Sequence, residues 1–147
     1  MIERRHPRLK EYDYRTAGAY FITICCEHRE LWFDSKLPYR EIADQEIKSF
    51  SERYPYLEIP KYVIMPNHLH LLMVMDDSVP IEQRKEIPRL VGELKSLSTR
   101  ACRKAGFPKE HLYQASFYEH IVRTEQDYAE IWQYIDSNPQ KWEEDRY

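Results

Sequence analysis

The chain has 147 residues, of which 42% are hydrophobic and 32% are charged, and its formal net charge is −3 at pH 7. This length fits a single domain, predicted over residues 1–147, that can bury a core without disulfide staples. The composition excludes a disordered chain, and no apolar run approaches the roughly 18 residues of a membrane-spanning helix. The first residues lack the apolar stretch of a secretory signal peptide.

Three cysteines occur in the sequence: Cys25, Cys26 and Cys102. An odd number, with two adjacent cysteines inside an apolar run, argues against a disulfide framework and favours a reducing compartment. We therefore expect a cytoplasmic protein with no membrane partner.

The charge of the chain is unevenly distributed. The negative total is not that of a strongly basic, non-specific nucleic-acid binder. Residues 81–110, however, carry an excess of basic side chains, whereas residues 123–147 carry an excess of acidic ones. The composition thus permits a nucleic-acid-binding face without requiring one.

A strand and a helix are the first predicted elements. Residues 19–27 are apolar, β-branched and aromatic, which is typical of a buried strand. Apolar residues then recur at helical spacing, and this predicts an amphipathic helix that Pro55 ends. Its apolar stripe consists of Ala43, Ile47, Phe50 and Tyr54.

Two more strands and a second helix follow. Residues 58–63 and 69–75 predict strands joined by a tight link at residues 65–67. A helix is predicted from Pro88 to about Ala105, because proline suits a first helical turn. Its apolar stripe consists of Leu90, Leu94, Leu97 and Ala101.

The last predicted elements are a strand over residues 117–123 and a helix over residues 124–138. Thr124 to Asp127 have the spacing of a capping box, although aspartate in the fourth position weakens the motif. The element order predicts an α+β fold, a ferredoxin-like βαββαβ antiparallel sheet with two helices on one face plus an appended C-terminal helix. Residues 1–18 are predicted to form an N-terminal arm.

His68 and His70 stand out in the third predicted strand. Alternate residues of a strand face the same way, so the two imidazoles project from one face about 6.6 Å apart at the backbone. Burying two polar rings among apolar neighbours is costly without partners. A metal site is therefore favoured over ordinary hydrogen-bonded core histidines.

The last predicted helix offers a third ligand. Tyr134 and Asn138 are four residues apart and share a helix face. On the pattern alone, packing remains the favoured interpretation of Tyr134, one of 12 tyrosines. For Asn138 the favoured interpretation is a helix C-terminal residue before Pro139.

Four blocks of sequence resemble one known family. They cover residues 12–24, 63–70, 116–123 and 134–139, and they include the histidine pair and the tyrosine of the last helix. In this order they resemble REP-associated tyrosine transposases, relatives of the IS200/IS605-type single-tyrosine HUH transposases. The C-terminus departs from longer members, because little follows Pro139.

The resemblance implies a metal-dependent endonuclease and strand transferase that acts on single-stranded DNA at hairpin-forming, REP-like repeats. It implies that Tyr134 is the nucleophile and forms a 5′-phosphotyrosine intermediate. It also implies that His68, His70 and Asn138 hold a divalent ion, Mg²⁺ or Mn²⁺. Two imidazoles and an amide also suit Ni²⁺ or Zn²⁺.

DNA contacts are expected from the basic side chains. One group lies in the predicted arm, a second lies on the predicted helix that starts at Pro88, and one residue precedes the last helix. For each residue, a solvated surface position is the competing interpretation. The candidates are Arg4, Arg5, Arg8, Lys95, Arg100, Arg103, Lys104 and Arg123.

Two other functions stay open on the sequence. One is a catalytically silent module that binds DNA by its structure, and the other is a metal-dependent hydrolase of small phosphoesters that uses water as nucleophile. A covalent protein–DNA adduct would separate the transposase from both. Monomer and homodimer are both compatible with the sequence.

Overall fold

The computed structural model describes residues 12–138, and in them a four-stranded antiparallel sheet has the order β2-β3-β1-β4. The strands are β1 (Gly18–Cys25), β2 (Leu57–Met65), β3 (His68–Met75) and β4 (Tyr118–Val122). The helices are α1 (Tyr39–Phe50), α2 (Ile87–Lys104) and α3 (Glu125–Ser137), with short 3-10 helices η1 (Glu27–Arg29) and η2 (Ile81–Gln83). This order confirms the ferredoxin-like plan with an appended helix.

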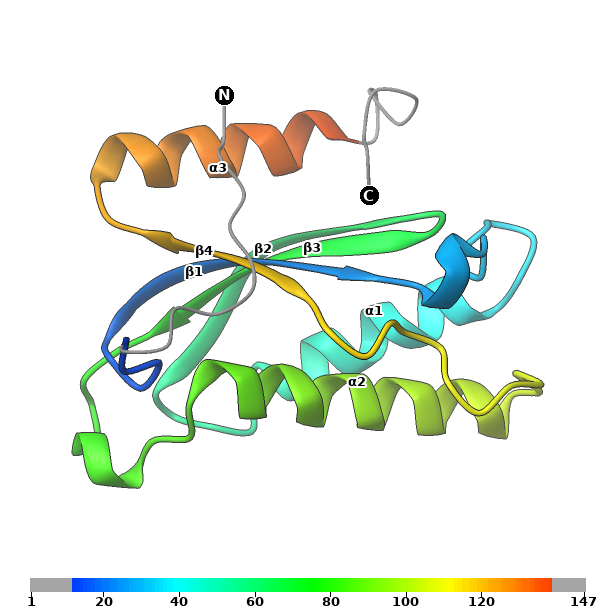
Figure 1. Ribbon diagram of the computed structural model, residues 1–147, viewed down its shortest axis with the longest axis horizontal. Coiled ribbons are helices and arrows are strands. Elements are labelled where there is room, and N and C mark those ends of the chain that lie inside the picture. Colours follow the sequence, from blue (N-terminus) through cyan, green and yellow to red (C-terminus); the bar gives the residue numbers. More distant parts are fainter. Residues whose placement is uncertain (1–11, 139–147) are drawn as a thin grey trace.

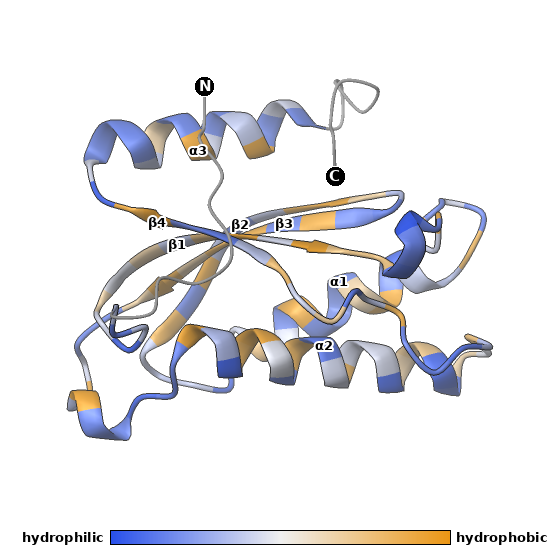
Figure 2. Cartoon of the chain, viewed as in Figure 1, coloured by the Kyte–Doolittle hydropathy of each residue, from blue (hydrophilic) through white to orange (hydrophobic). Residues whose placement is uncertain are grey.

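The sheet separates two layers of helices. Helices α1 and α2 lie on one face and α3 lies on the other (Figure 1). Hydrophobic residues follow the strands and recur along α2 and α3 (Figure 2). The larger apolar cluster includes residues of α1, α2 and the sheet, and the smaller one consists of Phe21, Leu72, Ile131 and Ile135 with partly buried neighbours.

Strand β3 is covered on both faces, because helices pack against each side of the sheet. Leu69, Leu71 and Met73 belong to the larger cluster. Leu72, which points to the opposite face, belongs to the smaller cluster under α3. This alternation explains why β3 reads as almost continuously apolar in the sequence, with histidines as the exceptions.

The predicted element bounds hold to within two residues, except for the end of the first helix. Helix α1 ends at Phe50, so the prediction that it continues to Pro55 is wrong. The Ser51 hydroxyl donates to the carbonyl of Lys48, and the chain then turns, with Arg53 N–H bonded to the carbonyl of Phe50. A residue before proline is also disfavoured in helical conformation, which excludes Tyr54 from the helix.

The three cysteines are buried thiols. Among residues 12–138, every helix is too short or too polar to span a membrane. Of the predicted N-terminal arm, residues 1–11 lie outside the described part of the chain, and so do Arg4, Arg5 and Arg8.

The core of the sheet can be tested at Leu71, which is fully buried on β3. We expect Leu71→Ala to lower the free energy of unfolding by about 2–5 kcal/mol, because the change leaves a cavity between the sheet and the two helices. Urea denaturation measures this loss. Leu37→Ala is the control: Leu37 is 38% exposed, so a change within about 0.5 kcal/mol is expected there.

Candidate active site

His68 and His70 lie on the face of β3 that α3 covers. Both side chains are fully buried, and their ring centroids are 4.8 Å apart. The His70 ring stacks on Phe21 of the cluster under α3, with centroids 5.3 Å apart. The prediction that the two imidazoles share one face is therefore confirmed.

Each imidazole is held through its Nδ1 atom. His68 Nδ1 lies 2.8 Å from Asn67 Oδ1, and His70 Nδ1 lies 2.9 Å from Thr23 Oγ1. Asn67 Nδ2 donates to the carbonyl of Arg29, which orients the Asn67 amide so that its oxygen faces His68. An amide oxygen only accepts, so His68 carries its proton on Nδ1 and presents Nε2 as the basic nitrogen.

Sequence reasoning missed Thr23 and Asn67. The signal for Thr23 is the antiparallel register, which pairs it with His70 across β1 and β3. That pairing depends on which strands are neighbours, and the sequence does not specify this directly. Asn67 is adjacent to His68 in the turn before β3, where an asparagine is also common for purely local reasons.

Helix α3 brings Tyr134 to His70 and carries Asn138 one turn farther along. The Tyr134 ring lies 5.4 Å from the His70 ring and 5.9 Å from the Phe21 ring, measured between centroids. Asn138 caps the helix and is 3% exposed, and its Nδ2 donates to the carbonyl of Tyr134 at 3.0 Å. Asn138 Oδ1 is buried and has no hydrogen-bond partner among the described residues.

These side chains fit a divalent metal ion. A buried amide oxygen without a partner is costly, and a cation would satisfy it. The hydrogen bonds at Nδ1 orient both imidazoles in the way that outer partners orient metal-binding histidines. Within residues 12–138, no three His, Cys, Asp or Glu side chains form a metal-binding group, and the amide oxygen of Asn138 offers a donor of another type.

The sequence of the chain also matches a known protein family. The family model for IS200-like transposases matches residues 15–138, which is most of the chain. The chain belongs to the IS200-like transposase family. The resemblance drawn from the four sequence blocks is confirmed, and family membership supports a transposase-type function.

Two proteins of Haemophilus influenzae are similar to this chain. An uncharacterized protein is 33% identical over an alignment of 167 positions, which covers 97% of this chain and 92% of that protein. A protein assigned as a REP-associated tyrosine transposase is 29% identical over 141 residues, which cover 88% of this chain and 74% of that protein.

Two solved structures share the fold. A REP-associated tyrosine transposase bound to a REP hairpin matches with a TM-score of 0.71 at 22% identity, covering 93% of this chain and 74% of that chain. A protein of Deinococcus radiodurans assigned as a transposase matches with a TM-score of 0.53 at 23% identity, covering 90% of this chain and 97% of that chain.

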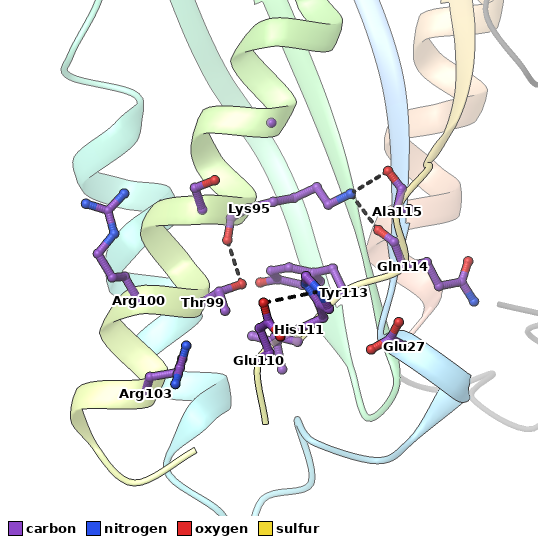
Figure 3. A pocket seen from close by; sticks show the side chains of 13 residues that line it. Glu27, Lys95, Thr99, Arg100, Arg103, Glu110, His111, Tyr113, Gln114 and Ala115 are labelled. Carbon is purple, nitrogen blue, oxygen red and sulfur yellow. Dashed lines mark hydrogen bonds and ion pairs between the residues drawn. The ribbon is translucent and has the colours of Figure 1, made fainter. Parts of the chain in front are cut away.

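The basic candidates on α2 differ in their surroundings. Arg100 and Arg103 are exposed and line a cavity of about 550 Å³ with Glu110, His111 and Tyr113 (Figure 3). Lys104 lies exposed in the last turn of α2, and Arg123 lies exposed just before α3. Arg100, Arg103 and Lys104 thus share α2, whereas Arg123 lies in the link between β4 and α3.

Lys95 is placed differently from the other basic candidates. Its ammonium donates to the carbonyls of Gln114 at 2.6 Å and Ala115 at 3.2 Å (Figure 3). Burial lowers the pKa of Lys95, because the cation is partly removed from water. The ammonium therefore ties the segment before β4 to α2.

We expect Lys95→Met to lower the free energy of unfolding by about 1–3 kcal/mol, because two carbonyls lose their charged donor. Urea denaturation of the free protein measures the change. Lys104→Met on the same helix is the matched control and should stay within about 0.5 kcal/mol of the wild type. Equal stability of the two variants would contradict the structural role of Lys95.

Proposed function

We propose that this IS200-like transposase is a metal-dependent endonuclease and strand transferase of single-stranded DNA. In this proposal, Tyr134 is the nucleophile, and His68, His70 and Asn138 hold the metal ion. The substrate is DNA that folds into hairpins, as in REP-like repeats. We further propose that the protein acts in the cytoplasm, as a monomer or a homodimer.

The observation that carries the proposal is the position of the Tyr134 phenol beside a pair of buried imidazoles, with a buried amide one turn farther along the same helix. The Tyr134 ring lies 5.4 Å from the His70 ring. Asn138, one turn farther along α3, has a buried amide oxygen with no hydrogen-bond partner among residues 12–138. A bound cation would satisfy this oxygen, which supports the assignment of Asn138 as a ligand.

The proposed step at Tyr134 is a transesterification. The phenolic oxygen of Tyr134 attacks the phosphorus of the DNA backbone, and the bond between phosphorus and the 3′ oxygen breaks. The phenol loses its proton and the departing 3′ oxygen gains one, which leaves a 5′-phosphotyrosine and a free 3′-hydroxyl. Attack by a 3′-hydroxyl reverses the step, so joining needs no external energy source.

A bound divalent ion would act as a Lewis acid on the scissile phosphate and stabilise its developing charge. His68, His70 and Asn138 would supply two imidazole nitrogens and one amide oxygen. This donor set suits Mn²⁺ better than Mg²⁺, which prefers oxygen ligands, and it also accommodates Ni²⁺ or Zn²⁺. Thr23 and Asn67 orient the two imidazoles through Nδ1.

Hairpin DNA is proposed as the substrate on two grounds. The first is the solved REP-associated tyrosine transposase of the same fold, which is bound to a REP hairpin. The second is the exposed basic side chains of Arg100, Arg103, Lys104 and Arg123, which can neutralise phosphates.

The nucleophile can be tested with Tyr134→Phe. We expect this change to abolish the covalent protein–DNA adduct, because phenylalanine lacks the attacking oxygen, while hairpin binding remains. The measurement is a denaturing gel after incubation with single-stranded hairpin DNA and Mn²⁺, with a parallel binding titration.

Tyr128→Phe is the matched control, since Tyr128 lies on the same helix, with its ring on Trp132. This variant should form the adduct as the wild type does. An adduct that persists in Tyr134→Phe would overturn the assignment. A wild-type protein that binds the hairpin and forms no adduct would instead indicate a silent binding module.

The metal ligands can be tested without any DNA. We expect Thr23→Val to weaken Mn²⁺ binding by about 10- to 100-fold, because His70 loses the partner that orients its ring. Calorimetric titration of the free protein with Mn²⁺ measures this effect. Thr99→Val on α2 is the control and should bind Mn²⁺ as the wild type does. Unchanged binding in Thr23→Val would contradict the role of His70 as a ligand.

A further inference from the structure

A single row of side chains crosses the sheet beneath α3. In the strand register, His120 of β4 pairs with Phe21 of β1, Phe21 pairs with Leu72 of β3, and Leu72 pairs with Lys61 of β2. Phe21 and Leu72 belong to the apolar cluster under α3. Paired residues of neighbouring strands share a face, so all four point to the side that α3 covers. The row is therefore apolar in its middle and basic at both edges.

The two ends of this row bind acidic residues at opposite ends of α3. His120 Nε2 lies 2.8 Å from Asp127 Oδ2 in the first turn of the helix. At the other edge, Lys61 forms an ion pair with Asp136 in the last turn. The Lys61 ammonium also lies 4.9 Å from the centroid of the Trp132 ring. Helix α3 is thus tied to both edge strands of the sheet.

The spacing of the two ties matches the dimensions of helix and sheet. Asp127 and Asp136 are nine residues apart, about 13.5 Å along an α-helix. His120 and Lys61 are three strands apart, about 14 Å across a sheet. Between the ties, Ile131 and Ile135 of α3 pack on Phe21 and Leu72. One helix can therefore engage the whole row at once.

The two polar contacts fix the position and orientation of α3 on the sheet, which the apolar contact alone does not. The free energy gained when Ile131 and Ile135 pack on the sheet is roughly proportional to the apolar area they bury. Small shifts of the helix along the sheet therefore change it little. Hydrogen bonds and close ion pairs depend on distance and angle. Asp127 and Tyr134 are seven residues apart and so lie on the same side of α3. A tie at Asp127 consequently restrains the side of the helix that carries Tyr134.

We propose that His120 and Lys61 are positioning residues for the reaction of Tyr134. Acting through Asp127 and Asp136, they hold α3 at both ends so that the Tyr134 ring stays beside His70. This inference rests on the proposed function, because it assumes that Tyr134 is the nucleophile. Neither residue is required to touch the DNA or the metal ion.

The test separates the rate of the chemical step from binding. His120→Phe and Lys61→Met remove one tie each while retaining an apolar side chain of similar length. We expect each to lower the rate of adduct formation by roughly 10- to 100-fold, since a small misplacement of the nucleophile is sufficient for such a loss. Affinity for the hairpin oligonucleotide should stay within about twofold, which corresponds to less than 1 kcal/mol.

A charge exchange tests whether the tie itself is responsible. The double variant Lys61→Asp with Asp136→Lys restores the ion pair in reverse, and the new ammonium on α3 would lie one helical turn from Trp132. We expect it to recover the rate to within about threefold of the wild type. The rate of amide hydrogen exchange in residues 125–138 should rise in the single variants and fall back to the wild-type rate in the double variant.

Lys48→Met is the matched control, because the exposed Lys48 forms an ion pair with Asp44 on α1, across the sheet from α3. It should change neither the rate nor the exchange of α3. Wild-type rates in His120→Phe and Lys61→Met would overturn the proposal. A loss of hairpin affinity equal to the loss of rate would also overturn it, because the residues would then act on DNA binding.

Failure of the proposed function gives a different result. If Tyr134→Phe still forms adducts, Tyr134 is not the nucleophile, whatever the tie variants do. If Tyr134→Phe forms none while the tie variants keep the wild-type rate, the nucleophile stands and the positioning role is wrong.

Discussion

The burial of two imidazoles between β3 and α3 is the constraint on which the candidate site depends. A buried polar ring must find a partner, and here each Nδ1 has one within the sheet or its adjoining turn, Thr23 for His70 and Asn67 for His68. These bonds orient both rings on one face of β3. Covering that face requires a helix that can bring apolar and polar side chains together. Helix α3 does so with Ile131 and Ile135 beside Tyr134 and Asn138.

The fold was accessible from the sequence because its signals are local. Strand and helix periods, together with the prolines, predict every strand and every α-helix in the correct order. The one clear error, at the end of α1, arose because Tyr54 continues the apolar stripe by coincidence. Tyr54 is bonded to Glu93 of α2 from outside the helix. Helical spacing of apolar residues indicates which side chains face the core. It does not show whether the backbone between those residues is helical.

The candidate site was accessible only in part. His68 and His70 could be placed on one face because strand alternation requires it. Their outer partners could not be found, because Thr23 becomes a neighbour of His70 only through the pairing of β1 with β3. The same limit applies to His120 and Lys61, whose common row depends on the order of all four strands. Lys95 shows another part of this limit, because its charge is visible in the sequence but its hydrogen bonds to two carbonyls are not.

The first turn of α3 shows how helix formation and helix placement can draw on the same residue. Thr124 accepts a hydrogen bond from the backbone N–H of Asp127, as an N-cap should. In a full capping box, a longer glutamate at position 127 would reach back to the cap residue. Aspartate instead turns its carboxylate toward the neighbouring strand at His120. The helix therefore lacks the second hydrogen bond of a capping box at this position, and the side chain that would make it instead binds His120 of the sheet.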